Sequence, residues 1–151
     1  VNLQSSTCVE LAQHKNIIAV KEASGNLQQI MEILRDKPSD FDVLSGDDGI
    51  TQPMMALGAK GVISVAANGY PDIFCKMVTS MLEKDTSTAL SLHYKMLRMN
   101  NLIFADGNPA GIKYLMSLQN LCKNILRLPL VTVNDIVKVD LEKELNVMYN
   151  K

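Results

Sequence analysis

The amino-acid sequence predicts an α/β fold, in which a parallel sheet of alternating strands and helices is followed by a region of helices alone. Three short apolar runs recur about every 25 residues, which is close to the repeat of a parallel βα architecture. Polar residues and glycines follow each run, as expected where a strand ends and a helix begins. Because no convincing strand follows residue 70, we expect residues 1–84 to hold the sheet and residues 85–151 to form a C-terminal helical region.

Strands and helices are expected to alternate through the first part of the chain. The run Ile17–Val20 is continuous, apolar and rich in β-branched residues, so we expect a strand that is buried on both faces. Asn26 is a suitable N-cap for the helix that follows, and Gly58 is a suitable C-terminal stop for the next one. The expected elements are a helix at 5–14, a strand at 17–20, a helix at 27–37, a strand at 41–44, a helix at 51–57 and a strand at 61–65.

Helices account for the regular structure expected after residue 70. Apolar residues recur there at helical spacing, and Asp85 or Thr86 is suited to cap the second of these helices. Pro129 disfavours a helical conformation at Leu128, so we expect an extended connector around these two residues. The expected helices lie at 71–84, 86–103, 109–118 and 134–149.

Lys21 is the first candidate for a catalytic residue. It directly follows Ile17–Val20, and so should lie at the carboxyl end of a strand, where α/β barrels and open α/β sheets place their chemistry. A lysine partly withdrawn from water has a lowered pKa, and as a neutral amine it can attack a carbonyl to give a Schiff base. The ends of the other two strands should bring residues 45–47 and 64–68 to the same rim. The competing interpretation is a solvated lysine without a catalytic role.

Composition and charge argue against several other classes of function. The chain of 151 residues has a formal net charge of −1 and lacks the basic stripe expected of a protein that binds nucleic acid or an anionic membrane. No apolar run approaches the ~20 residues of a membrane span. The three cysteines and two histidines are too scattered to predict a metal site. The cysteines fit reduced thiols, so we expect a cytoplasmic protein.

Three motifs resemble, in order along the chain, the dihydrodipicolinate synthase and N-acetylneuraminate lyase family of class I aldolases. IAVKEASGNL at residues 18–27 resembles the strand that carries the Schiff-base lysine of this family. LSGDD at residues 44–48 and GVISVAAN at residues 61–68 resemble the ends of the next two barrel strands. Asn108-Pro109 and RLPL at residues 127–130 are similar to parts of the helical tail of the family.

The resemblance implies a fold and a chemistry. The fold is a TIM-type (β/α)8 barrel, of which this chain would hold the last three strands with their helices and the C-terminal helical region. Lys21 matches the lysine that forms an imine with pyruvate, and Gly46 and Ile63 match positions that line the pyruvate pocket. The imine acts as an electron sink, so the pyruvate methyl group can lose a proton and become a nucleophilic enamine. This covalent chemistry needs no separate cofactor or metal.

Within the family, the motifs are more similar to the synthases than to the lyases. The synthases condense pyruvate with L-aspartate-4-semialdehyde in the diaminopimelate route to lysine, and the family forms homo-oligomers of two or four chains. The resemblance therefore implies pyruvate and an aldehyde as substrates, and other copies of the chain as partners.

The resemblance covers nearly the whole chain but begins partway through the sequence of the family. A complete (β/α)8 barrel takes about 250 residues, whereas this chain has 151. We therefore expect the first five strands to lie outside this chain, and the chain alone to lack synthase activity. Two alternatives stay open, namely a related lyase-type aldolase acting on another aldehyde and a non-catalytic remnant that serves as an oligomerisation module.

Overall fold

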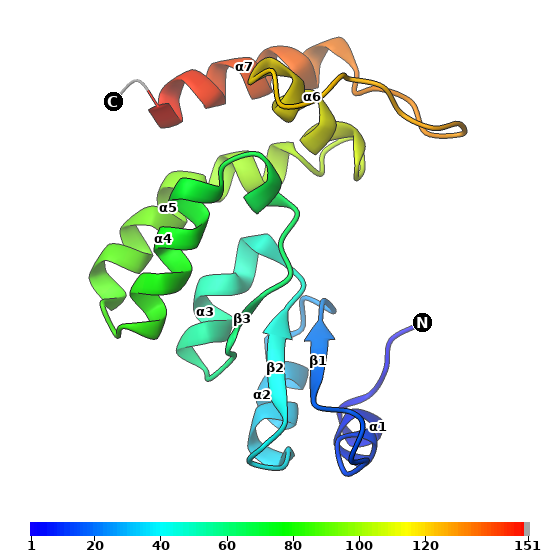
Figure 1. Ribbon diagram of the computed structural model, residues 1–151, viewed down its shortest axis with the longest axis vertical. Helices are drawn as coiled ribbons and strands as arrows, with labels where there is room; N and C mark the ends of the chain where they lie inside the picture. Colours follow the sequence, from blue (N-terminus) through cyan, green and yellow to red (C-terminus); the bar gives the residue numbers. More distant parts are fainter. Residues whose placement is uncertain (150–151) are drawn as a thin grey trace.

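A computed structural model describes residues 1–149 as a three-stranded parallel sheet with helices, followed by four further helices (Figure 1). The first part consists of α1 (Ser5–Leu11), β1 (Ala19–Glu22), α2 (Leu27–Asp36), β2 (Asp42–Ser45), η1 (Asp48–Ile50), α3 (Thr51–Ala56), β3 (Gly61–Val62) and η2 (Ala66–Asn68). The second part consists of α4 (Pro71–Leu82), α5 (Thr86–Leu102), α6 (Ala110–Leu118) and α7 (Asp135–Tyr149). This order confirms the predicted alternation, and no strand follows residue 70 within the described residues.

The sheet has the strand order β1-β2-β3, and both neighbouring pairs are parallel. Lys21 lies opposite Leu44, and Leu44 lies opposite Gly61. Because successive side chains of a strand point to opposite faces, Lys21 and Leu44 share one face of the sheet. Val43 and Glu22 share the other face.

Helices of this chain cover only the face of the sheet that carries Val43 and Glu22. There α1, α2 and α3 pack against Val43, which is fully buried. The other face is open, and Ile63 on that side is 50% exposed. The expectation of strands buried on both faces is therefore wrong for this chain, because βα units alone place cover on one side of their strands. The core on the covered face consists of Cys8, Ile30, Ile33, Val43, Met54, Met55 and Ala59.

A second core joins the four later helices to the end of the sheet. α4 and α5 pack against each other, and α5 and α6 both contact α7. The largest side chains in this core are Tyr70, Phe74, Met77, Met96, Met99, Ile103, Leu115, Leu141 and Met148. Four of these are methionines, whose flexible side chains fill the space between these helices. The predicted boundary between residues 84 and 85 falls in the turn between α4 and α5. The division of the chain into two domains at this boundary stays a prediction.

The strand boundaries differ from the predicted ones. β1 spans residues 19–22 and not 17–20, so Lys21 lies within the strand and one residue before its end. The reason is pairing, because Lys21 and Glu22 both have partners in β2. β3 is shorter than predicted and ends at Val62, after which the chain soon turns into η2.

Helix caps follow the predicted chemistry. The Asn26 side chain accepts hydrogen bonds from the backbone N–H groups of Gln28 and Gln29 at the start of α2. The Asp85 carboxylate accepts one from the N–H of Thr88 at the start of α5. These side chains satisfy N–H groups that have no partner within a helix. The first helix is shorter than predicted, because α1 ends at Leu11 and gives way to turns before β1.

Candidate active site

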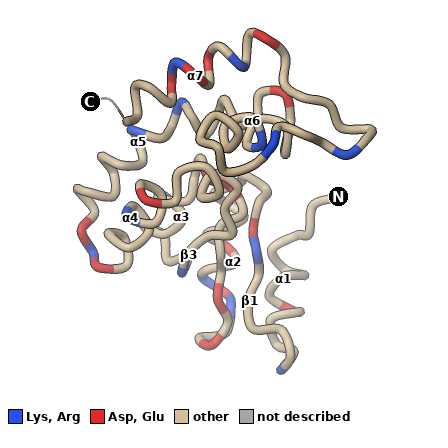
Figure 2. The backbone as a smooth tube through the Cα atoms, turned by 45° about the horizontal axis from the view of Figure 1, so that its top comes forward, with Lys and Arg blue, Asp and Glu red and all other residues tan. Residues whose placement is uncertain are grey.

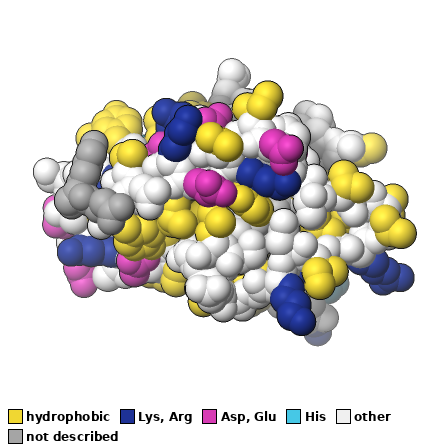
Figure 3. Space-filling model, turned by 90° about the horizontal axis from the view of Figure 1, so that it is seen from above, with side chains coloured by type: hydrophobic (Ala, Val, Ile, Leu, Met, Phe, Trp, Pro, Cys, Tyr) yellow, Lys and Arg dark blue, Asp and Glu magenta, His cyan; other side chains and the backbone are white. Residues whose placement is uncertain are grey.

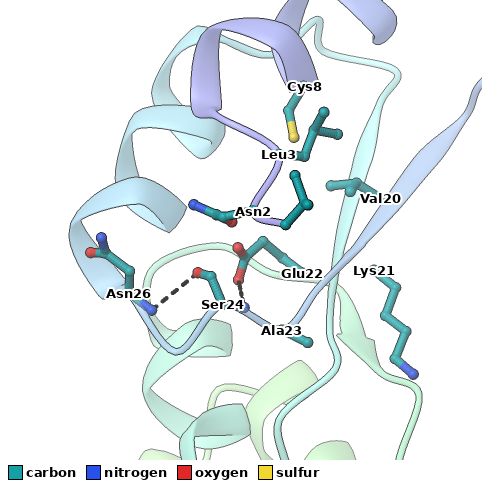
Figure 4. A pocket seen from close by; sticks show the side chains of 10 residues that line it. Asn2, Leu3, Cys8, Val20, Lys21, Glu22, Ala23, Ser24 and Asn26 are labelled. Atoms are coloured by element: carbon teal, nitrogen blue, oxygen red, sulfur yellow. Dashed lines mark hydrogen bonds between the residues drawn. The ribbon is translucent and has the colours of Figure 1, made fainter.

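Lys21 projects from β1 on the open face of the sheet, and its side chain is exposed. Figure 4 shows it pointing away from the cavity beside β1, on the side opposite to Glu22. The described residues therefore do not withdraw this amine from water. The desolvation expected for a reactive lysine has to come from atoms that cover the open face.

Gly46 allows the Lys21 side chain to lie across the end of β2. A Cβ added at Gly46 would lie 2.8 Å from the Lys21 Cε and 2.8 Å from the Ala23 Cβ, closer than real Cβ contacts come. The Gly46 N–H donates to the Glu22 carbonyl oxygen at 2.7 Å, which fixes this close approach. The absence of a side chain at this position is therefore a requirement of the Lys21 conformation.

Ile63 completes the group of three predicted site residues. Its N–H donates to the Ser45 carbonyl oxygen at 2.8 Å, so it continues the pairing with β2 just beyond the end of β3. By strand alternation its side chain points to the same open face as Lys21. The structure thus brings Lys21, Gly46 and Ile63 to the carboxyl end of the three strands, while their roles stay a prediction.

Glu22 belongs to a buried polar network on the covered face. Its carboxylate accepts hydrogen bonds from Gln29 Nε2 at 3.0 Å and from the Ser24 N–H at 3.2 Å. A cavity of about 570 Å³ lies beside it and is also lined by Asn2 and Cys8 (Figure 4). Burial, and then the Glu22 charge, raise the pKa of the Cys8 thiol. Glu22 faces away from Lys21, so this network holds β1 against α2 and does not contact the lysine.

Asp48 is the polar residue that the sequence analysis missed. It is 2% exposed, and its Oδ2 accepts hydrogen bonds from the N–H groups of Val65 at 3.0 Å and Ala66 at 2.9 Å. The signal in the sequence is the pair Asp47-Asp48, which comes soon after a predicted strand. Sequence alone does not reveal which aspartate of the pair turns inward. Asp47 remains at the rim and caps η1 by accepting from the Gly49 N–H.

Charged and apolar groups on the surface show no single dominant patch in the views drawn. Basic and acidic residues are both spread along the described chain (Figure 2). Apolar side chains stand among charged ones on the face that carries α7 (Figure 3), and the exposed ones on α7 include Ile136, Val139 and Val147. No group of three or more potential metal ligands occurs among residues 1–149. None of the described helices is long and apolar enough to cross a membrane.

Comparison with known proteins places the chain in a family. A sequence profile of the dihydrodipicolinate synthetase family matches residues 1–148. The chain belongs to this family. Among curated relatives, the 4-hydroxy-tetrahydrodipicolinate synthase of Phocaeicola vulgatus is 50% identical over 132 residues, which are 87% of this chain and 44% of the relative. The chain spans about half the length of the relatives that it matches, and it corresponds to their C-terminal half.

Solved structures of dihydrodipicolinate synthases share this fold. The enzyme from Aquifex aeolicus is 37% identical, with a TM-score of 0.92 over 99% of this chain and 51% of the enzyme. A chloride-inhibited synthase from Acinetobacter baumannii, solved in complex with pyruvate, is 30% identical, with a TM-score of 0.94 over 98% of this chain and 51% of the enzyme. These neighbours are TIM-barrel enzymes, and the chain covers about half of their length. The predicted partial barrel of three strands with their helices, followed by a C-terminal helical region, is therefore confirmed.

Proposed function

We propose that the chain supplies the imine-forming half of a 4-hydroxy-tetrahydrodipicolinate synthase, a lyase of the diaminopimelate route to lysine. The observation that carries this proposal is the placement of Lys21 over Gly46, with Ile63 beside them at one rim. The synthase named above, whose structure holds pyruvate, supports pyruvate as the first substrate. The names of the relatives favour L-aspartate-4-semialdehyde as the second substrate over another aldehyde.

The chemistry follows from the amine and the pocket. The Lys21 amine adds to the ketone carbon of pyruvate, and loss of water leaves an imine whose nitrogen withdraws electrons. A proton then leaves the pyruvate methyl group, and the resulting enamine carbon forms a bond to the aldehyde carbon of the second substrate, whose oxygen takes up a proton. Addition of water or of an amine at the imine carbon then releases the Lys21 amine. Gly46 would leave room for the bound keto acid beside Lys21, and Ile63 would form an apolar wall of the pocket. No separate cofactor is required for these steps.

Turnover should require cover over the open face. Lys21 and Ile63 are exposed, and β1 and β3 are the two edges of the described sheet. Parallel barrel strands are normally buried on both faces, and the synthase relatives are about twice as long as this chain. We propose that strands equivalent to their other half complete the pocket, and that the chain alone has no synthase turnover. The free cysteines support a reducing, cytoplasmic setting.

The proposal is tested by trapping the imine. The 151-residue chain, joined to the N-terminal half of a synthase relative so that the open face is covered, is incubated with pyruvate, reduced with borohydride and weighed by mass spectrometry. We expect the wild type to gain the mass of one reduced pyruvate adduct. Lys21→Arg should gain none, because the guanidinium stays protonated. The control Lys15→Arg changes an exposed lysine in the turn before β1 and should trap like the wild type.

Two results would contradict this assignment. Equal trapping by Lys21→Arg and the wild type would mean that another amine reacts. No trapping by the wild-type chain when it is joined to the N-terminal half of a synthase relative, at pyruvate concentrations that label that relative itself, would favour the alternative of a non-catalytic module. The exposed side chain of Ile63 on the open face is the observation that favours such a module.

A further inference from the structure

The carboxyl ends of β2 and β3 are joined by one buried carboxylate. Asp48 opens η1, directly after the rim residues of β2, and is 2% exposed. Its Oδ2 accepts hydrogen bonds from the N–H groups of Val65 and Ala66, at 3.0 and 2.9 Å. These N–H groups follow Ile63 in the chain. The Asp48 side chain therefore ties the segment that carries Gly46 to the segment that carries Ile63.

This contact takes the place of a longer strand pairing. β3 pairs with β2 only through Gly61 and Val62, and the last hydrogen bond along this pair is from the Ile63 N–H to Ser45. Beyond that point the backbone of β3 turns away into η2. A hydrogen bond from a backbone N–H to a carboxylate is stronger than one between neutral groups. Asp48 thus fixes the segment after β3, where no backbone hydrogen bonds to β2 remain.

Asp48 is also braced by the helical region. The Asn100 side chain of α5 is 3% exposed, donates to the Asp48 backbone carbonyl oxygen at 3.4 Å and accepts from the Tyr70 hydroxyl at 2.5 Å. Tyr70 is fully buried, and burial and the Asp48 charge both raise the pKa of its hydroxyl. The buried polar chain Tyr70–Asn100–Asp48 connects the second core to the rim of the sheet.

We propose that Asp48 is a positioning residue that fixes the distance between Gly46 and Ile63 and so sets the width of the pyruvate pocket. This inference rests on the proposed function for its chemical meaning. It assigns Asp48 no contact with substrate, since its carboxylate is buried and directed to the backbone of residues 65 and 66. We call the two hydrogen bonds that Asp48 accepts from Val65 and Ala66 the clamp. The inference predicts that loss of the clamp weakens pyruvate binding while the Lys21 amine can still react.

Two variants separate the hydrogen bonds from the charge. Asp48→Ala removes both. Asp48→Asn removes the charge but keeps one oxygen that can accept from the N–H groups of Val65 and Ala66. The amide nitrogen of this variant would take the place of Oδ1, which has no hydrogen-bond partner among the described residues. Asp85→Ala is the matched control, because Asp85 is an exposed carboxylate that caps α5 through the Thr88 N–H.

The first measurement is backbone amide exchange in the 151-residue chain, resolved by residue. In the wild type, the amides of Val65 and Ala66 should exchange far more slowly than that of Gly25, an exposed residue in the loop between β1 and α2. Asp48→Ala should speed both by roughly tenfold or more, the size expected when a hydrogen bond to a charged group is lost. Asp48→Asn should stay close to the wild type, and Asp85→Ala should leave both amides unchanged.

The second measurement is the pyruvate concentration that gives half-maximal borohydride trapping in the chain joined to the N-terminal half of a synthase relative. Asp48→Ala should raise this concentration by roughly tenfold, while saturating pyruvate still labels Lys21 as fully as in the wild type. A simple loss of stability would instead lower the labelled fraction at saturation. Asp48→Asn should restore most of the wild-type value, and Asp85→Ala should match the wild type.

The outcomes distinguish this inference from the proposed function. If the wild type traps no pyruvate, the proposed function fails, while amide exchange still decides whether Asp48 clamps the strands. If Val65 and Ala66 exchange as fast as Gly25 in the wild type, there is no clamp and the inference is overturned, even where Asp48→Ala does not fold. If Asp48→Ala frees both amides without changing the half-maximal pyruvate concentration, the clamp exists but does not position the pocket, which also overturns the inference.

Discussion

At the scale of single residues, the site depends on how closely Lys21 and Gly46 approach each other. Strand pairing sets the backbone of both residues, and the missing side chain of Gly46 leaves a path for the lysine stem. The sequence motifs pointed to both residues through their resemblance to a family. They did not reveal this contact, because residues 21 and 46 become neighbours only when two parallel strands pair.

Adding a methyl group at Gly46 should displace the Lys21 side chain. In Gly46→Ala the new Cβ would lie 2.8 Å from the Lys21 Cε and from the Ala23 Cβ, so at least one of them has to move. We expect trapping of pyruvate at Lys21 to slow by about tenfold, since a displacement of an ångström at a reacting atom costs this much or more. The rate of borohydride-trapped adduct formation measures it.

Gly49→Ala provides the control for this prediction. Gly49 follows Gly46 in the same loop, but a Cβ there would meet only the Asp47 Oδ1, at 3.4 Å. Its rate of trapping should therefore stay within about twofold of the wild type. Equal slowing in both variants would show that the loop, and not the contact with Lys21, controls the rate.

At the scale of elements, the helices could be predicted more completely than the strands. Asn26 and Asp85 predict the starts of α2 and α5, because their side chains are suited to cap a helix. The shift of β1 and the early end of β3 could not be predicted in this way. The first depends on pairing with β2, and the second depends on a carboxylate from another segment binding the N–H groups of Val65 and Ala66.

The buried histidine of α5 should make stability depend on pH. His93 is 7% exposed, its Nδ1 has no hydrogen-bond partner among residues 1–149, and burial lowers the pKa of its imidazole from the usual 6.5. The unfolded chain therefore binds a proton at a pH where the folded chain does not. Stability from this group is complete above about pH 6.5 and is lost as the pH falls below it.

Urea unfolding between pH 7.5 and 5 measures this effect. In His93→Gln the unfolding midpoint should change less with pH over this range than in the wild type. His14→Gln is the control, because His14 is exposed in the turn after α1 and should leave the pH dependence of the wild type unchanged. An identical pH dependence in wild type and His93→Gln would contradict the assignment.

At the scale of the whole molecule, the chain forms two joined cores but leaves one face of its sheet open. Family resemblance predicted a partial barrel, and the comparisons confirm the fold. Sequence periodicity could not predict that one face of the sheet is open. An apolar run predicts burial, whereas the described residues leave Lys21 and Ile63 exposed on one face of the sheet.

The open face should make the isolated chain self-associate. Exposed apolar strand faces and free parallel edges favour association, so native mass should rise with protein concentration. Ile63→Lys places a charge on the open face and should lower association. Leu82→Lys changes an exposed leucine at the end of α4 and should not. A wild type that stays monomeric at all concentrations, with its core folded, would show that this face needs no cover.

The central claim is that Lys21 forms the imine with pyruvate, and mapping the reduced adduct tests it most directly. The wild-type chain, joined to the N-terminal half of a synthase relative, is treated with pyruvate and borohydride while folded, then digested and analysed by peptide mass spectrometry. The account predicts the adduct on the peptide that contains Lys21 and on no other lysine-containing peptide. An adduct spread over several exposed lysines, or located on another single lysine, would contradict it.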